Sequence, residues 1–226
     1  MKVGILQTGR APEALMDQTG DYDALFRDLL AGHGFDFVTF AVLDGEFPAS
    51  VEDADAWLIT GSRHGVYEDH DWIPPLEALI RKIDARRLPL VGVCFGHQII
   101  AQALGGRVEK FKGGWSVGAT EYDCAGTPLV LNAWHQDQIV ERPKGAQVAA
   151  SSAFCKNAVL TYGDHIWTVQ AHPEFTADFI DALIRTRGRG VVPDAQLEAA
   201  TEQLSTPTDN AKIARKIAAF FKKPRP

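Results

Sequence analysis

The stretch PLVGVCFGHQIIAQALGG, at residues 89–106, decides the fold. Its first part belongs to an apolar run over 88–93, which predicts a buried strand. Residues 95–104 have the spacing of an amphipathic helix, and two glycines after it end the helix. Between strand and helix lies Gly92-Val93-Cys94-Phe95-Gly96, a Gly-x-Cys-x-Gly step. A sharp turn there leaves no room for side chains at the two glycine positions and pushes the cysteine sulfur out over the sheet edge. The sequence therefore predicts a reactive thiol at Cys94.

The residues before this stretch alternate between strands and helices. The spacing of apolar residues predicts strands over 3–6, 35–42 and 56–60, and helices over 22–31 and 73–86. Such alternation implies parallel strands joined by right-handed crossovers. We expect the α/β class, with a doubly wound, mostly parallel sheet that carries helices on both faces.

The residues after the stretch follow a different pattern. Residues 107–170 contain short β-type runs separated by Gly and Pro turn signals, which predict a small antiparallel extension. Helical spacing returns over 175–187, 194–204 and 209–221. We expect one domain over 1–226, with a core over about 1–185 and a helical C-terminal extension over 186–226.

Composition narrows the class of function. The 226 residues are 46% hydrophobic and carry a formal net charge of −6, which fits a globular protein and disfavours nucleic acid or a membrane surface as the main partner. A small-molecule substrate is the expectation. The first apolar run is too short for a signal-peptide core, so a cytoplasmic location is expected. The three cysteines lack metal-ligand spacing, and Cys124 and Cys155 have the surroundings of ordinary buried thiols.

A thiol nucleophile needs a base, and the best candidate is in Gln170-Ala171-His172-Pro173-Glu174-Phe175. Residues two apart in an extended segment point the same way, so the Glu174 carboxylate can orient the His172 imidazole. His172 lies 78 residues after Cys94, at the end of a predicted strand, and can reach the thiol only through the fold. Taken alone, the segment also fits a turn before a helix.

The Cys94 step and the segment 170–175 together resemble the class I, triad-type glutamine amidotransferases, and specifically stand-alone members similar to GMP synthase. Weaker matches are Leu58-Ile59-Thr60-Gly61-Ser62, Gly114-Trp115-Ser116-Val117-Gly118 and Trp134-His135-Gln136-Asp137. The resemblance implies that Cys94 is the nucleophile, His172 the base and Glu174 the orienting carboxylate.

The same resemblance implies an oxyanion hole and a substrate pocket. The backbone N–H groups of Gly61 and Phe95 would hold the oxyanion, and a glycine at the end of the third strand suits that close approach. Gln98 would hold the amino-acid end of the substrate, although it also fits a solvent-facing helix position. Trp134, His135 and Gln136 would line the pocket, and His135 also fits a polar strand end.

The expected reaction is hydrolysis of the glutamine side-chain amide through a cysteine thioester, with release of ammonia to an acceptor that the sequence does not name. The resemblance implies no metal and no cofactor. It allows a partner, namely a separate subunit that carries the synthase activity. Two alternatives stay open: a free-standing γ-glutamyl peptidase or hydrolase with the same triad, and a non-catalytic binding or regulatory module with the same fold.

Overall fold

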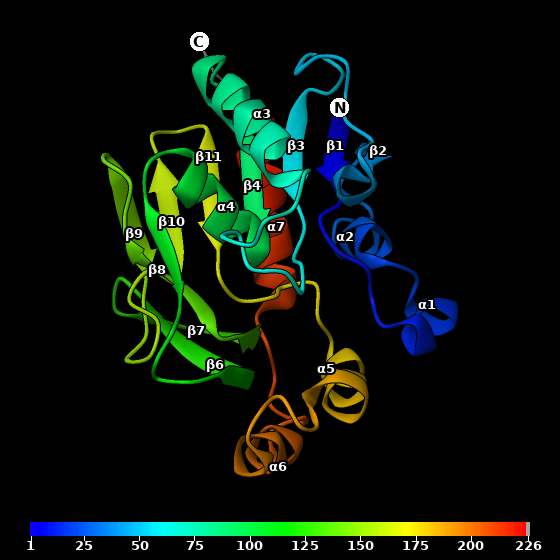
Figure 1. Cartoon of the computed structure of the whole chain (residues 1–226), viewed down its shortest axis with the longest axis vertical. Helices are drawn as coiled ribbons and strands as arrows, with labels where there is room; N and C mark the ends of the chain where they lie inside the picture. The colour runs from blue at the N-terminus through cyan, green and yellow to red at the C-terminus, as the bar shows by residue number, and fades with distance from the viewer. Residues whose placement is uncertain (225–226) are drawn as a thin grey trace.

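The computed structural model describes residues 1–224 and places the chain in the α/β class (Figure 1). A seven-stranded sheet lies at its centre, in the order β2-β1-β3-β4-β11-β10-β9. Its strands are β1 (Lys2–Leu6), β2 (Asp36–Phe40), β3 (Ala56–Ile59), β4 (Leu90–Val93), β9 (Ala146–Ala150), β10 (Val159–Tyr162) and β11 (Ile166–Val169). The strands from β2 to β11 in this order pair in parallel, and β10 and β9 add to the edge in antiparallel pairing. The predicted mostly parallel sheet is confirmed.

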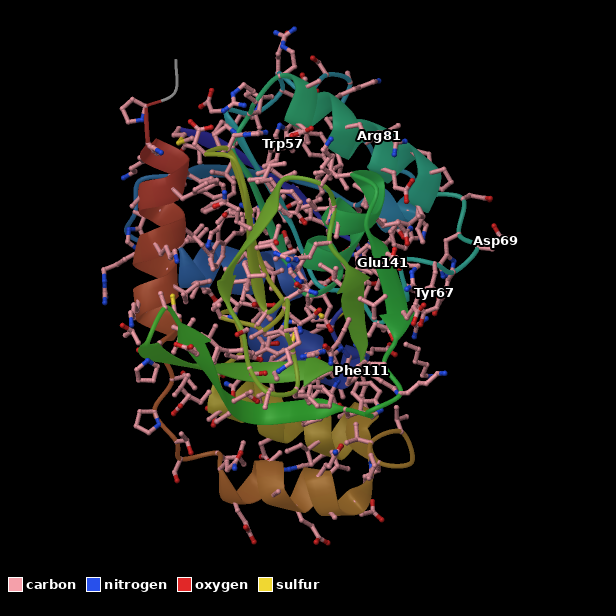
Figure 2. All side chains as sticks on the ribbon, turned by 90° about the vertical axis from the view of Figure 1, so that its left-hand side faces the viewer. Trp57, Tyr67, Asp69, Arg81, Phe111 and Glu141 are labelled. Carbon is pink, nitrogen blue, oxygen red and sulfur yellow. The ribbon has the colours of Figure 1, made fainter. Side chains whose placement is uncertain are left out.

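Helices cover both faces of this sheet, as expected for a doubly wound fold. The helices of the described chain are α1 (Glu13–Thr19), α2 (Tyr22–Leu29), α3 (Ile73–Ala85), α4 (Phe95–Ala103), α5 (Ala177–Leu183), α6 (Asp194–Glu202) and α7 (Asn210–Lys222). Short turns of other helical type cover Val42–Asp44 and Ile184–Gly188. The apolar side chains of α3 and α4 pack on one face, and those of α2 and α7 pack on the other. Figures 1 and 2 show α3 and α7 on opposite sides of the sheet.

The C-terminal helix α7 belongs to the main core. Its residues Ile213, Ile217 and Phe221 recur at four-residue spacing and are buried in the same apolar cluster as Val91 and Val93 of β4. Burying each of these side chains contributes about 1.5–3 kcal/mol. The predicted C-terminal helices are therefore present, and the last of them completes one face of the sheet.

The region 107–170 differs in part from the prediction. It contains the two-stranded antiparallel sheets β5–β8 and β6–β7, formed by β5 (Arg107–Lys110), β6 (Ser116–Cys124), β7 (Thr127–His135) and β8 (Asp137–Glu141). However, β11 is a parallel strand of the central sheet, between β4 and β10. Its short apolar run carries no signal of the strand it pairs with, so its neighbour could not be predicted locally.

A third apolar cluster joins α1, α5 and α6 beyond the carboxyl edge of the sheet. Helix α1 was not predicted, because only a single buried leucine, Leu15, marks its apolar side. Helix α5 begins two residues later than predicted, where the Thr176 hydroxyl accepts a hydrogen bond from the Phe179 N–H. None of the helices in residues 1–224 has the length and apolar character needed to cross a membrane.

Candidate active site

The sharp turn between β4 and α4 holds Cys94 in an unusual backbone conformation, with φ 52° and ψ −102°. Few non-glycine residues have positive φ, and such strain tends to persist at functional sites. A side chain at Gly96 would place its Cβ 2.4 Å from the Ile59 carbonyl oxygen, and one at Gly92 would lie 2.5 Å from the Gly96 oxygen. Both glycines are therefore required by space, as the sequence predicted.

Parallel pairing of β11 with β4 brings the second half of the site to the same sheet edge. Val169 pairs with Val93, and the Cys94 N–H donates to the Val169 carbonyl at 2.9 Å. The chain then continues to His172, whose N–H donates to the Asn132 carbonyl of β7 at 2.8 Å. The main chain that leads to His172 and the backbone of His172 itself are thus hydrogen-bonded to neighbouring segments of the fold.

His172 and Glu174 form a buried pair next to Cys94. The His172 Nδ1 lies 2.7 Å from the Glu174 Oε1, and the two side chains are 5% and 2% exposed. Burial lowers the pKa of His172, but the negative charges of Cys94 and Glu174, with their hydrogen bonds, outweigh it and raise that pKa to about 10. The Phe175 ring stacks on the imidazole at 3.9 Å between centroids and 2° between planes. The imidazole is therefore oriented by both a carboxylate and an aromatic ring.

Two backbone amides beside Cys94 are available to a ligand. Within residues 1–224, neither the Gly61 N–H nor the Phe95 N–H donates a hydrogen bond. Phe95 is the first residue of α4, where N–H groups have no intrahelical acceptor. A Cβ at Gly61 would lie 3.0 Å from the His172 Cε1 and 3.8 Å from the Cys94 Cβ, so Gly61 adjoins both side chains. Such amides can hold a developing oxyanion.

A chain of two buried glutamines leads to the sulfur. The Gln170 Nε2 lies 3.7 Å from the Cys94 Sγ, and the Gln98 Nε2 donates to the Gln170 Oε1 at 3.1 Å and to the Asp137 carbonyl at 2.9 Å. The solvent-facing alternative for Gln98 is thus excluded, since its side chain is buried. Its Oε1 accepts no hydrogen bond from residues 1–224.

The site opens into a cavity of about 440 Å³. Trp134, His135 and Gln136 line it together with Cys94, Gln98 and His172. The His135 Nδ1 lies 3.2 Å from the Asp137 carbonyl, its Nε2 has no partner in the described chain, and burial lowers the pKa of the ring to about 3. A neutral imidazole therefore presents an unpaired nitrogen in this region.

Several lining residues were not predicted as site residues. Tyr22 stands against Phe175, and its hydroxyl accepts a hydrogen bond from Arg187 at 3.1 Å. Lys110 and Trp115 line the same cavity. Gln170 could have been identified as a site residue from sequence. It lies two residues before His172 in an extended segment, so its side chain points the same way as those of His172 and Glu174. Tyr22 and Arg187 meet only through the tertiary fold.

Cys155 and His97 lie in the core, away from the site chemistry. Burial raises the pKa of Cys155 to about 12, which keeps it a neutral thiol at physiological pH. His97 is fully buried, with its Nδ1 2.7 Å from the Thr168 hydroxyl, and it is not among the cavity residues.

Known proteins share the sequence family and the fold of this chain. Residues 40–184 match the family described as glutamine amidotransferase class-I. The chain is 30% identical to γ-glutamyl peptidase 4 of Arabidopsis thaliana over 92% of its length and 89% of that relative. It is 31% identical to one subunit of the glutamine-hydrolysing GMP synthase of Halobacterium salinarum, over 71% of this chain and 87% of that one. A crystal structure of a glutamine amidotransferase from Methylobacillus flagellatus superposes with a TM-score of 0.76 at 24% identity, covering 97% of this chain and 92% of that chain.

Proposed function

Because the chain belongs to the class I glutamine amidotransferase family, we propose that it hydrolyses γ-glutamyl amide bonds with Cys94 as nucleophile, and that its substrates are γ-glutamyl peptides. The observation that carries this proposal is that Cys94 and His172 line one cavity, with the Glu174 carboxylate bound to the far nitrogen of the His172 ring. A non-catalytic module would have no need of a strained cysteine beside a buried histidine-carboxylate pair.

In the first half of the reaction, the Cys94 sulfur attacks the γ-carbonyl carbon while His172, whose raised pKa keeps the imidazole protonated, holds the proton of the thiol. The carbonyl oxygen becomes an oxyanion that accepts hydrogen bonds from the Gly61 and Phe95 N–H groups. His172 then gives its proton to the amide nitrogen, the C–N bond breaks, and the amine leaves. A γ-glutamyl thioester remains on Cys94.

In the second half, water attacks the thioester while His172 accepts its proton. The C–S bond breaks, glutamate leaves, and the proton taken from water stays on His172 beside the released Cys94 sulfur. Glu174 keeps its charge throughout and stabilises the imidazolium form of His172 in each half. Neither half requires a metal or an organic cofactor.

The size and lining of the cavity favour peptides over free glutamine. Its volume of about 440 Å³ lies in the range of roughly 300–1,000 Å³ that takes drug-sized ligands, which are larger than glutamine. Lys110 and Arg187 line it, and they can pair with a carboxylate of the departing peptide, whereas departing ammonia has none. Four γ-glutamyl peptidases of Arabidopsis thaliana, at 27–30% identity, support the same choice.

A kinetic panel on the purified chain tests both parts of the proposal. We expect a higher kcat/KM for γ-glutamyl dipeptides and tripeptides than for glutamine, with release of the amino acid or peptide measured by chromatography and ammonia by a coupled enzyme. A higher kcat/KM for glutamine would overturn the choice of substrate alone. Unchanged turnover in Cys94→Ser would overturn the assignment of Cys94 as the nucleophile. Cys124→Ser is the matched control.

A second candidate is glutamine hydrolysis that supplies ammonia to a separate synthase, as the GMP synthase relative suggests. The pocket would hold the amino-acid end of glutamine in the same way, and the triad would act by the same steps. Ammonia would be the leaving group. This candidate predicts that glutamine turnover by the isolated chain is slow and rises when the synthase is added.

A further inference from the structure

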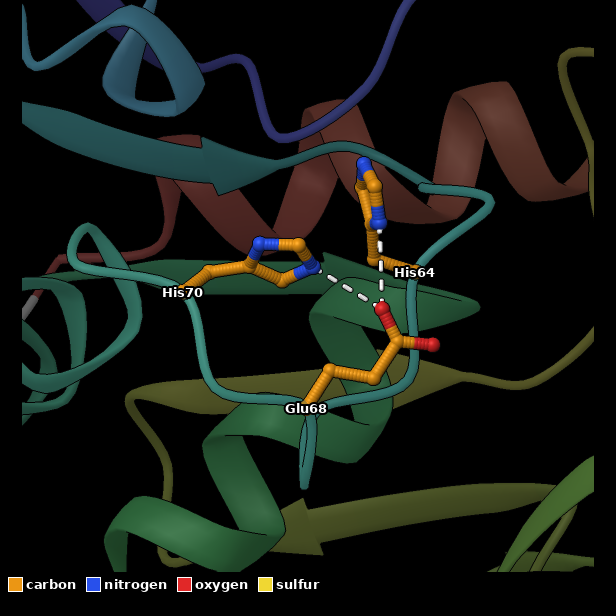
Figure 3. Close-up of side chains that lie close together, drawn as sticks. All are labelled: His64, Glu68 and His70. Atoms are coloured by element: carbon orange, nitrogen blue, oxygen red, sulfur yellow. Dashed lines mark hydrogen bonds and ion pairs between the residues drawn. The ribbon is translucent and has the colours of Figure 1, made fainter.

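Three side chains of the types that bind metal ions lie close together in the loop that joins β3 to α3. The Glu68 Oε2 lies 3.1 Å from the His64 Nδ1 and 2.8 Å from the His70 Nε2. Figure 3 shows both imidazole rings converging on this one carboxylate oxygen. All three candidate ligand atoms lie within 4.8 Å of one another. None of these residues takes part in the triad.

The loop holds this arrangement by its own backbone bonds. The Glu68 N–H donates to the Gly65 carbonyl at 3.1 Å, and the His70 N–H donates to the Glu68 carbonyl at 3.1 Å. The His70 ring also stacks on Trp72, with 5.7 Å between centroids and 15° between planes. Two backbone hydrogen bonds therefore hold the main chain of the loop, and the stacking contact holds the His70 ring, before any ligand arrives.

The donor set matches the preferences of zinc. Two imidazole nitrogens and one carboxylate oxygen form one of the known three-ligand zinc sets, with a fourth position left to water or another ligand. Tetrahedral coordination with bonds of about 2.0–2.1 Å places ligand atoms about 3.3 Å apart, so each atom here needs to move by about 1 Å or less. The side chains of His64, Glu68 and His70 are 24%, 43% and 31% exposed, which gives a hydrated ion access to them.

We propose that His64, Glu68 and His70 bind a divalent transition-metal ion, with Zn²⁺ as the best fit, at the rim of the catalytic cavity. His64 and Glu68 line the cavity that contains Cys94, and His64 and His70 line a second surface hollow beside it. Asp69, between two of the ligands, lies at the outer margin of the molecule in Figure 2. The ion can therefore enter from solvent without passing the triad.

A metal ion here would fix one wall of the catalytic cavity. Tyr67, within the same loop, donates a hydrogen bond from its hydroxyl to the Asp137 carboxylate at 3.0 Å. On the other side, Trp72 contacts the Phe95 ring at 5.5 Å between centroids, next to the proposed oxyanion donor. Binding should therefore stabilise the fold and order the cavity wall, without supplying a ligand to the triad.

Zn²⁺ and Co²⁺ titrations test the site directly. The protein should carry no polyhistidine tag and should contain Cys94→Ser, because a thiol beside His172 could itself bind Zn²⁺. We expect one Zn²⁺ per chain by calorimetry, visible d–d absorption of four-coordinate Co²⁺, and a Tm increase of roughly 5–10 °C at a hundredfold excess of free Zn²⁺ over Kd.

Substitutions separate metal binding from a hydrogen-bonded brace of the loop. His70→Gln keeps an N–H donor for Glu68 and loses the imidazole ligand, and Glu68→Gln loses the carboxylate. Each should weaken Zn²⁺ binding by about 100-fold or more, since loss of even outer-shell partners costs about 10–100-fold. His33→Gln, in the turn between α2 and β2 at the opposite sheet edge, is the matched control and should bind Zn²⁺ unchanged.

Two outcomes would overturn the proposal. One is the absence of both calorimetric Zn²⁺ binding and the Co²⁺ spectrum in folded Cys94→Ser protein. The other is equal Zn²⁺ affinity in the His70→Gln, Glu68→Gln and His33→Gln proteins, which would place any bound ion elsewhere. Circular dichroism of each variant establishes that the protein compared is folded.

Discussion

Replacing Glu174 by glutamine removes the charge that orients and stabilises the catalytic imidazole while keeping the shape of the side chain. The carboxylate lies 2.7 Å from the His172 Nδ1, with its side chain 2% exposed, so solvent cannot substitute for it. Both the orientation of the ring and the pH at which it loses its proton should change.

The size of the expected pH shift follows from the hydrogen bond between Glu174 and His172. A hydrogen bond to a charged group contributes about 1.5–3 kcal/mol, and about 1.36 kcal/mol corresponds to one pH unit. The pKa of His172 is raised to about 10, in part by Glu174, so the imidazolium form is lost as pH rises through that value. Glu174→Gln should therefore move the alkaline limb of the kcat/KM profile down by roughly one to two pH units. A fall in kcat of up to about 10⁴-fold should accompany it, as for the buried aspartate of serine triads.

The assay is hydrolysis of a γ-glutamyl peptide between pH 5 and 11, with single-turnover measurements to isolate thioester formation. Glu198→Gln removes an equal charge from the exposed surface of α6 and should leave both the profile and kcat unchanged. An alkaline limb at the same pH in Glu174→Gln, with kcat within about threefold of the parent, would refute the role of the carboxylate.

Three further substitutions test the rest of the site. Gly96→Ala would place a Cβ 2.4 Å from the Ile59 carbonyl oxygen, so we expect a loss of about 1–3 kcal/mol and a Tm lower by roughly 2–12 °C, and an unchanged Tm would contradict the packing of the turn. Gln170→Ala removes the N–H donor 3.7 Å from the Cys94 sulfur, and kcat/KM should fall about tenfold; a variant as active as the parent would leave Gln170 without a positioning role. Lys110→Ala should raise KM for γ-glutamyl peptides with a free terminal carboxylate by up to about fivefold and leave KM for glutamine unchanged, whereas an equal rise for both would remove Lys110 as a peptide contact.

The local parts of the site could be predicted from sequence because local sterics and alternation determine them. The Gly-x-Cys-x-Gly step around Cys94 has only one sharp strand-to-helix geometry that fits its glycines, and the structure has that geometry. His172 and Glu174 lie side by side because they are two residues apart in an extended segment. Their arrival at Cys94 depends instead on the insertion of β11 beside β4, a pairing between distant residues that no local pattern encodes.

The same sheet order explains why the proposed metal site lies close to the triad. The carboxyl ends of parallel strands meet at one edge, so β4 delivers Cys94, β11 delivers the segment with His172, and β3 delivers Gly61 followed by the loop with His64 and Glu68. Histidines and carboxylates in an irregular loop show no periodicity, and the spacing of His64, Glu68 and His70 along the chain did not mark them as ligands. Since Gly61 and the loop belong to one continuous segment, a ligand that orders the loop acts on the wall that carries an oxyanion donor. Chemistry at Cys94 and metal binding at Glu68 should therefore be coupled through the backbone of residues 61–72.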